Sequence, residues 1–203
     1  MRLIFVCMFF LFSAGCICFG GEVELVSAAS REAGKVAVFM RQSKSIELLS
    51  ETIEGDVLVC ADINGRIRWQ TFSPYESILI FDGKELSQYE KLSGGWKKLS
   101  AHSRESVKKI ISEISKLVVG DYSSYEVYKS GGKIFLTPKD GFAKKVLKSI
   151  LLVPSGDGKT VKSIEFTDSN GDKTVLTVLK IVENPKNFDS AFTEVFNFKV
   201  GEK

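Results

Sequence analysis

Most of the chain consists of short runs of apolar or alternating residues separated by turn residues, a pattern typical of antiparallel β-strands. Asp82-Gly83 lies between two such runs, and it is a strong hairpin signal because glycine accepts the positive φ of tight turns. Asn64-Gly65, Gly131-Gly132 and Asn170-Gly171 hold similar places between other runs. Strands are therefore expected at residues 36–42, 49–61, 66–72, 76–81, 125–129, 133–138, 146–153, 161–167 and 173–182, with one more between Asp82-Gly83 and Tyr89.

Residues 103–118 follow a different period. Apolar side chains recur there as they would on one face of an α-helix. They are Val107, Ile110, Ile111, Ile114, Leu117 and Val118. Ser103 suits the N-cap position of such a helix and Gly120 suits its C-cap. Many antiparallel strands with one apolar helix predict an α+β fold, in which the helix covers one face of a curved sheet.

Alternation along the strands places large apolar side chains on common faces. The sets expected to share a face are Ile67 with Trp69 and Thr71, Ile78 with Ile80, Ile150 with Leu152, and Ile164 with Phe166. Taken alone, these residues fit either a filled core or the lining of an apolar cavity.

The N-terminus has the layout of a secretory signal peptide. Arg2 precedes ten apolar residues and then small ones, and a run of ten is too short to span a bilayer, which takes about 20 residues. We expect residues 1–21 to be cleaved and residues 22–203 to form a single domain. Cys16 follows Ser13-Ala14-Gly15, a degenerate lipobox, so cleavage before Cys16 and its lipidation is the alternative.

Composition and motifs argue against several classes of protein. The net charge is +3 and the lysines are scattered, which is not the footprint of a nucleic-acid-binding protein. The chain has one histidine, His102, and no visible cluster of metal ligands or acid–base partners, so we expect neither a metal nor a cofactor and no enzymatic activity. Cys60 is the only cysteine beyond the signal region, which leaves no internal disulfide, and a buried apolar role is expected for it.

One group of residues resembles a known family. Its centre reads Arg68-Trp69, Pro74, Ile78 to Ile80, Asp82-Gly83-Lys84 and Tyr89. Phe39, Gln42 and Gly55-Asp56 precede it, and Phe135-Leu136-Thr137-Pro138, Ile164-Glu165-Phe166, Asn184 and Phe192 follow it. In this order and spacing, over residues 35–198, the chain resembles LolA, the periplasmic carrier of lipoproteins in Gram-negative bacteria.

The resemblance implies an incomplete β-barrel that is covered by a helical lid and encloses a cavity for acyl chains. The cavity would be lined by Ile67, Trp69, Ile78, Ile80, Leu136, Ile150, Leu152, Ile164 and Phe166. The lid would present Val107, Ile110, Ile111, Ile114 and Leu117.

The resemblance also implies partners and a location. The cargo would be acylated lipoproteins or a glycolipid, taken by a monomer in the periplasm from an inner-membrane exporter of the ABC or another type to an outer-membrane acceptor. The alternative is an acceptor of the LolB type, anchored to a membrane through Cys16. Family carriers latch the lid with an arginine, but Asp62-Ile63-Asn64 stands at that place here, so Arg66 or Arg68 is expected to replace it.

Overall fold

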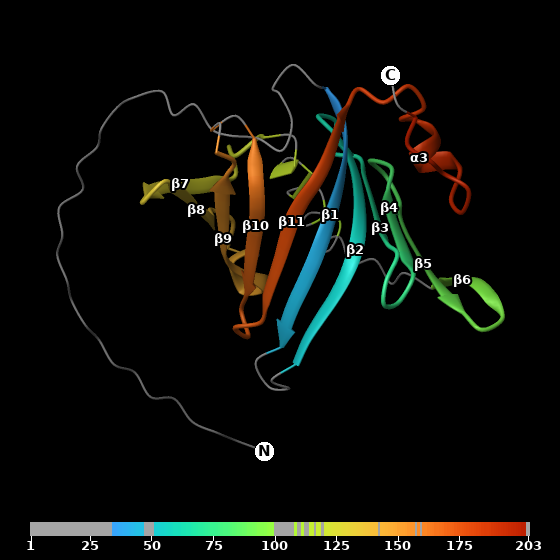
Figure 1. Ribbon diagram of the computed structural model, residues 1–203, viewed down its shortest axis with the longest axis horizontal. Helices are drawn as coiled ribbons and strands as arrows, with labels where there is room; N and C mark the ends of the chain where they lie inside the picture. The colour runs from blue at the N-terminus through green and yellow to red at the C-terminus, as the bar shows by residue number, and fades with distance from the viewer. Residues whose placement is uncertain are drawn as a thin grey trace.

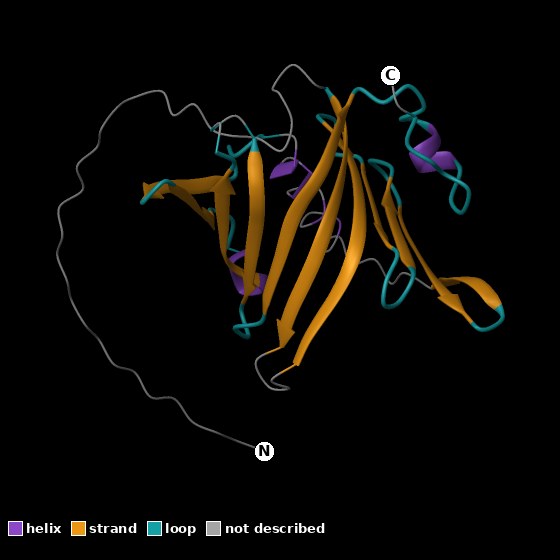
Figure 2. Ribbon diagram, viewed as in Figure 1, coloured by secondary structure: helices purple, strands orange, loops and turns teal. Residues whose placement is uncertain are grey.

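The protein is built on one large antiparallel sheet of eleven strands, as the computed structural model shows (Figure 2). The structure describes residues 34–46, 51–99, 108, 111, 114, 115, 117, 118, 120–141, 143–156, 158 and 160–201. The signal region with Cys16, the N-cap residue Ser103, His102, Val107 and Ile110 all lie outside the described residues.

The strands follow the chain as two meanders that meet in the middle of the sheet. They are β1 (Lys35–Ile46), β2 (Glu51–Asp62), β3 (Ile67–Thr71), β4 (Ser77–Phe81), β5 (Leu86–Leu92), β6 (Gly95–Leu99), β7 (Tyr125–Ser130), β8 (Lys133–Pro138), β9 (Leu147–Pro154), β10 (Val161–Asp168) and β11 (Lys173–Glu183). Their order in the sheet is β6-β5-β4-β3-β2-β1-β11-β10-β9-β8-β7 (Figure 1). Within the described part of the chain β6 and β7 are its two edges, so the sheet is open.

The predicted hairpins are confirmed. Gly65, Gly83 and Gly171 have φ values of 80°, 98° and 95°, which an L side chain adopts only with strain. The pairing of β1 with β11, from Val36 opposite Glu183 to Ser45 opposite Lys173, joins the first and last strands. Strand β6 was not predicted.

Helices form a small part of the described structure. The predicted helix over 103–118 is helical at each position that is described: Lys108, Ile111, Ile114, Ser115, Leu117 and Val118. Gly120 follows it with a φ of 84° and its N–H donates to the Leu117 carbonyl oxygen, as expected of a C-cap. Two short helices, α2 (Ala143–Val146) and α3 (Ser190–Thr193), were not predicted. Among the described residues, no helix has the length and hydrophobicity needed to span a membrane.

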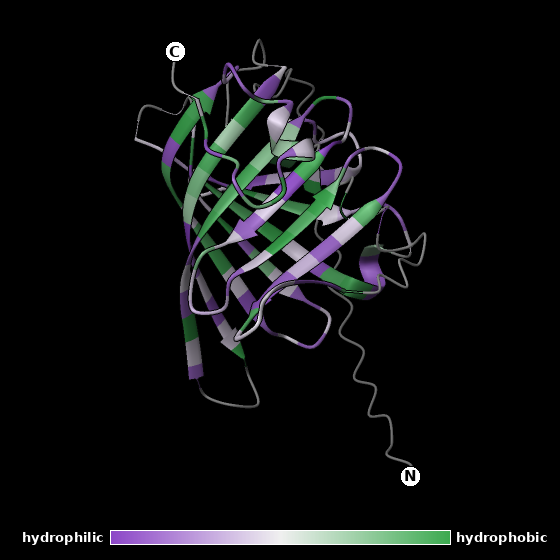
Figure 3. Ribbon diagram, turned by 90° about the vertical axis from the view of Figure 1, so that its right-hand side faces the viewer, coloured by the Kyte–Doolittle hydropathy of each residue, from purple (hydrophilic) through white to green (hydrophobic). Residues whose placement is uncertain are grey.

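The two faces of the sheet carry different apolar clusters, and hydrophobic and hydrophilic residues are accordingly mixed along the strands (Figure 3). On one face, which we call the helix face, Ile111, Leu117 and Val118 of the helix pack in a cluster with side chains from both meanders. On the opposite face, which we call the C-terminal face, Phe188, Ala191 and Phe198 pack against Ala37, Leu58 and Cys60. We call residues 188–198 the C-terminal segment, and α3 within it lies beside β2 to β4 (Figure 1).

Candidate functional site

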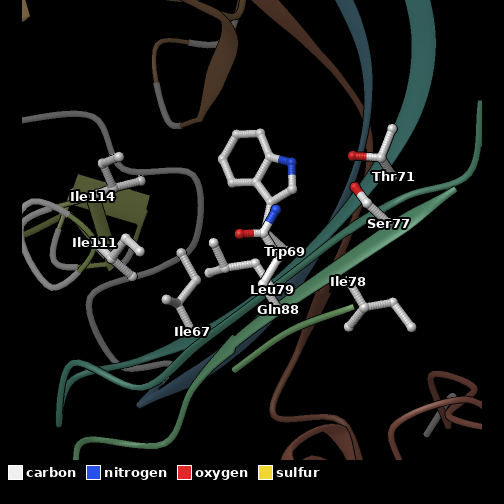
Figure 4. Close-up of a pocket in the computed structure, with 9 residues that line it drawn as sticks. All are labelled: Ile67, Trp69, Thr71, Ser77, Ile78, Leu79, Gln88, Ile111 and Ile114. Atoms are coloured by element: carbon white, nitrogen blue, oxygen red, sulfur yellow. The ribbon is translucent and has the colours of Figure 1, made fainter. Parts of the chain in front are cut away.

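An apolar pocket of about 280 Å³ lies on the helix face, between strands β3 to β5 and the helix (Figure 4). Its lining residues are Ile67, Trp69, Thr71, Ser77, Ile78, Leu79, Gln88, Ile111 and Ile114. Trp69, Leu79 and Ile114 are half-buried, whereas Ile67 and Ile111 are buried. The pocket is therefore a gap between two apolar surfaces that the helix only partly fills.

Five of the expected residues line this pocket, and Ile78 is one of them. Ile67 and Trp69 come from alternate positions of β3, and Ile111 and Ile114 come from one face of the helix. The spacing of these residues in the sequence, two in a strand and three in a helix, is what brings each pair to one face. Leu79, Thr71, Ser77 and Gln88 also line it and were not among the expected cavity residues.

On the helix face, the second meander contributes a filled core. Leu136, Ile150, Leu152 and Ile164 lie on the helix face as expected, but each is at most 2% exposed and packs in the same cluster as Leu117. Phe166 is half-buried at the edge of that cluster. None of these residues lines the pocket, so in this conformation they form core.

Ile80, which was expected in the cavity, does not line the pocket, and Ile78 lines it without directing its side chain into it. In the register of the sheet Ile80 stands beside Arg68 and Ile78 beside Gln70, on the C-terminal face. Ile78 borders the pocket, yet its side chain points away from Trp69 across the strands (Figure 4). The sequence gives no sign of this placement because all four residues from Ile78 to Phe81 are apolar, and such a run does not reveal which positions face which side.

A buried hydroxyl fastens the helix to the sheet. Ser115 is fully buried, and its Oγ donates to the carbonyl oxygen of Arg66 at 3.0 Å, with the carbonyl oxygen of Asp62 at 3.4 Å. Both carbonyls belong to the β2–β3 turn. Ser115 was not predicted, although a serine inside an apolar helical stripe is a signal of this kind of contact.

Arg66 and Arg68, the residues expected to latch the helix, direct their side chains away from it in this structure. Both side chains bind the C-terminal segment, on the other face of the sheet. Arg66 pairs with Asp62 at 2.7 Å and with Asp189 at 2.8 Å, and its guanidinium lies 4.6 Å from the centre of the Phe192 ring. Strand alternation explains this placement, because Arg68 precedes Trp69 and must point to the opposite face.

Arg68 anchors the C-terminal segment. It is 0% exposed, and its guanidinium donates to the carbonyl oxygens of Ala191 at 3.0 Å and Val195 at 2.7 Å. It also donates to the Gln70 side chain at 2.7 and 3.1 Å, and packs over the Phe198 ring. Burial lowers the pKa of Arg68 to about 10, so the guanidinium remains charged at neutral pH.

Cys60 lies beneath the same segment. It is 0% exposed and packs in a cluster with Phe188 and Ala191, which confirms the predicted buried role. Burial raises the pKa of the Cys60 thiol to about 12, and the nearby Arg68 lowers it by less. The thiol is therefore protonated and shielded at neutral pH.

Acidic side chains in the turns have local partners. The Asp168 carboxylate, in the turn between β10 and β11, accepts hydrogen bonds from the backbone N–H groups of Asn170 and Asp172 and so closes its own hairpin turn. Across the described residues, no three His, Cys, Asp or Glu side chains come together as a metal site would require.

Comparison with known proteins shows the family of the chain. The family model described as "Outer membrane lipoprotein carrier protein LolA" matches residues 58–195, which include the pocket strands, the helix and most of the C-terminal segment. A protein from Pectobacterium carotovorum subsp. carotovorum (strain PC1), named "Outer-membrane lipoprotein carrier protein", is 30% identical over 129 residues, 62% of this chain and 59% of that relative. The chain belongs to the LolA family of carrier proteins.

The solved structures that the chain matches include two proteins of related description. One is a putative outer membrane lipoprotein-sorting protein domain from Vibrio parahaemolyticus, with 10% identity, a TM-score of 0.42, and coverage of 80% of this chain and 91% of that one. The other is a LolA superfamily protein from Nitrosomonas europaea, with 11% identity, a TM-score of 0.41, and coverage of 74% and 86%.

Proposed function

We propose that this protein is a periplasmic carrier that holds the acyl chains of lipoproteins, or of a glycolipid, between its sheet and its helix and transfers them from the inner to the outer membrane. The observation that carries this proposal is the pocket on the helix face, where Ile67, Trp69, Ile111 and Ile114 border an unfilled apolar space. Membership of the LolA family supports it.

The energetics of acyl chains explain why such a pocket is needed. Burial of one methylene contributes about 0.8 kcal/mol, so a long acyl chain exposed to water costs on the order of 10 kcal/mol. A ligand of this kind crosses an aqueous compartment only when an apolar surface covers it. The exposed part of Trp69 and the facing isoleucines provide the beginning of such a surface.

Loading requires that the helix act as a lid. The pocket of about 280 Å³ is slightly smaller than most ligand sites, which span about 300–1,000 Å³. Outward movement of the helix would uncover the apolar side chains that share a cluster with Leu117 and add them to the cavity. These are Leu136, Ile150, Leu152, Ile164 and Phe166. The predicted cavity residues that now form core would then contact the cargo.

The remaining partners follow from this role. Residues 1–21 would direct export, an inner-membrane exporter would load the protein, and an outer-membrane acceptor would receive the cargo, with a monomer best suited to both transfers. The alternative, an anchored acceptor, depends on Cys16. Replacement of Cys16 by Ala without loss of membrane association would remove that alternative.

Lipid extraction tests the proposal. The protein would be purified from a bacterial periplasm, and its organic extract analysed by mass spectrometry beside a Trp69→Asn, Ile114→Asn variant. A matched control, Leu179→Asn, alters an apolar residue that is 57% exposed away from the pocket. We expect acylated species with the wild type and the control and their loss with the pocket variant. An extract without acylated species from the folded wild type would contradict the proposal.

A further inference from the structure

The pocket changes in polarity along the strands that form its floor. Residues paired across the sheet make successive rows on the helix face, about 6.6 Å apart because they are two residues apart in each strand. The first row is Ala61, Ile67, Phe81 and Leu86; the second is Val59, Trp69, Leu79 and Gln88; the third is Val57, Thr71, Ser77, Glu90 and Lys97. The first row is apolar throughout, and the third is mostly polar.

This change divides the pocket into two ends (Figure 4). Ile67 lies at one end with Ile111 and Ile114 of the helix, Trp69 lies in the middle, and the hydroxyls of Thr71 and Ser77 lie at the other end. Thr71 and Ser77 are direct partners across β3 and β4, so their side chains are neighbours. An elongated ligand with one apolar and one polar end fits this pocket in one orientation only.

The polar groups have free hydrogen-bonding capacity. Within the part of the chain that the structure describes, the side chains of Thr71, Ser77 and Gln88 make no hydrogen bond to another residue, although all three are half-buried. A half-buried polar group gains stability when a ligand supplies its partner. Hydroxyl and amide N–H groups are donors suited to a carbonyl oxygen.

The lining also carries no charge. None of the nine residues is acidic or basic, and Glu90 and Lys97 of the third row lie outside the lining. Transfer of a charged group into an apolar pocket without a charged partner is costly, whereas a neutral carbonyl needs only a hydrogen bond. The lining therefore favours a neutral linkage over a carboxylate or phosphate.

We propose that the pocket binds an amphiphile in a single orientation, with its acyl chain toward Ile67, Ile111 and Ile114 and its neutral ester or amide linkage on Thr71, Ser77 and Gln88. This inference rests on the proposed carrier function and adds to it a linkage site and a direction. The polar remainder of the ligand leaves the pocket beside the β3–β4 connection, where Phe72 and Tyr75 are 42% and 80% exposed.

The β3–β4 connection is held against β2 at the polar end of the pocket. The backbone of Ser73 approaches β2 so closely at Gly55 that a Cβ there would lie 1.9 Å from the Ser73 carbonyl oxygen. The Ser73 hydroxyl also lies within 3.2 Å of the backbone N–H of Asp56, which donates to it. The place where the polar part of the ligand leaves the pocket therefore has a fixed position relative to Thr71.

A paired-probe binding assay tests the linkage site. Displacement of diphenylhexatriene, which is wholly apolar, would report the affinities for a C16 monoacylglycerol (an ester) and a C16 N-acylethanolamine (an amide). The test variant is Thr71→Val with Ser77→Ala, which removes both hydroxyls and keeps the shapes. The matched control is Ser87→Ala with Thr177→Val, which removes the same groups from the opposite face of the sheet.

We expect the test variant to bind the carbonyl probes about 10-fold more weakly, as for the loss of one to two hydrogen bonds, and diphenylhexatriene within about twofold of the wild type. A loss of affinity for the ester probe alone, or for the amide probe alone, also supports the linkage site. It identifies which of the two linkages the pocket binds. Unchanged affinity for both, or an equal loss for all three probes, would overturn the inference while the carrier function stands. A folded wild type that binds no probe would overturn both.

Tryptophan quenching tests the orientation directly. The chain has two tryptophans, so Trp96→Phe leaves Trp69 as the single reporter. Trp69 lies one row from Thr71, about 6.6 Å along the strand. We therefore expect bromine on the acyl carbons nearest the linkage to quench Trp69 more strongly than bromine at the chain terminus. Stronger quenching by the terminal bromine would reverse the orientation and contradict the inference.

Discussion

The sheet has a cover on each face, and the two covers are held in different ways. On the helix face the described contacts are apolar, apart from the hydroxyl of Ser115, and a pocket remains beside Trp69. On the C-terminal face the buried guanidinium of Arg68 bonds three backbone carbonyls of the C-terminal segment. Apolar contact can be exchanged for contact with a ligand, whereas carbonyls that lose a buried charged donor are left unpaired. On the proposed function, the helix would be the cover that a ligand displaces, and the C-terminal segment would be the cover that stays.

The largest expected effect comes from Arg68. The change Arg68→Met keeps much of the side-chain volume but leaves the carbonyls of Ala191 and Val195 without their donor, which should cost about 3–4 kcal/mol of unfolding free energy. Urea unfolding of the purified variant measures this. The control Arg41→Met removes an exposed ion pair with Asp56 and should change stability by less than about 0.5 kcal/mol. Equal effects of the two changes would contradict the anchoring role of Arg68.

Thiol labelling compares the two covers in one protein. Cys60 lies buried under the C-terminal segment with its pKa raised to about 12, so alkylation at pH 8 should await unfolding. A cysteine placed by Ile114→Cys would line the pocket on the helix face and should react about 100-fold faster, which corresponds to about 2.7 kcal/mol. Mass spectrometry of timed samples gives both rates. Comparable alkylation rates at the two positions would mean that reagent reaches the sheet equally easily under both covers, which would contradict the contrast between them.

A smaller effect is expected at the helix contact. Ser115→Ala removes the hydrogen bond to the Arg66 carbonyl and should destabilise the docked helix by about 1 kcal/mol. The variant should therefore bind a hydrophobic dye faster than the wild type. The control Ser43→Ala lies on the central strand β1 outside the pocket and should leave the rate unchanged. A slower or unchanged rate in the Ser115 variant would argue against opening through the helix.

The smallest expected effect is the contribution of Asp189 to stability, which should depend on pH. The Arg66 side chain, followed by that of Lys35, lowers the pKa of Asp189 by hydrogen bonding. A carboxyl whose pKa is lowered on folding stabilises the protein above its unfolded pKa of about 4 and loses that contribution as the pH falls through the folded value. Asp189 is 68% exposed, so solvent screening limits the contribution to about 0.5 kcal/mol. Asp189→Asn should therefore destabilise the protein slightly at pH 6, and the difference should shrink as the pH falls below about 4 and vanish once Asp189 is protonated in the folded protein; a difference that did not shrink would contradict this assignment.

Local signals in the sequence predicted much of the fold. The hairpin at Asp82-Gly83 and the helix that contains Ile111 and Ile114 depend on neighbours in the chain, and both are present. The pairing of β1 with β11 depends on residues more than 120 positions apart, which no local pattern reveals. Ile67 and Trp69 were assigned to the correct face because Arg68 and Gln70 alternate with them, whereas the uniformly apolar β4 gave no such guide.

The second cover was missed for a physical reason. The C-terminal segment has no regular period beyond one helical turn, since α3 spans only Ser190–Thr193. Its apolar residues Phe188, Phe192, Phe196 and Phe198 could have signalled a buried segment. Arg68, an arginine inside a strand, appears polar in the sequence, and only the fold shows that it packs against the Phe198 ring.

Hydrogen exchange in the presence and absence of the C16 monoacylglycerol tests the central contrast most directly. In the free protein, peptides that contain Ile111, Ile114 and Leu117 should exchange through local opening, and the ligand should alter their rate. The amides of Ala191, Phe192 and Glu194, which donate within the C-terminal segment, should exchange only with global unfolding and be unaffected by the ligand. A helix that exchanges only on global unfolding, or a ligand that alters the C-terminal segment in its place, would contradict the account.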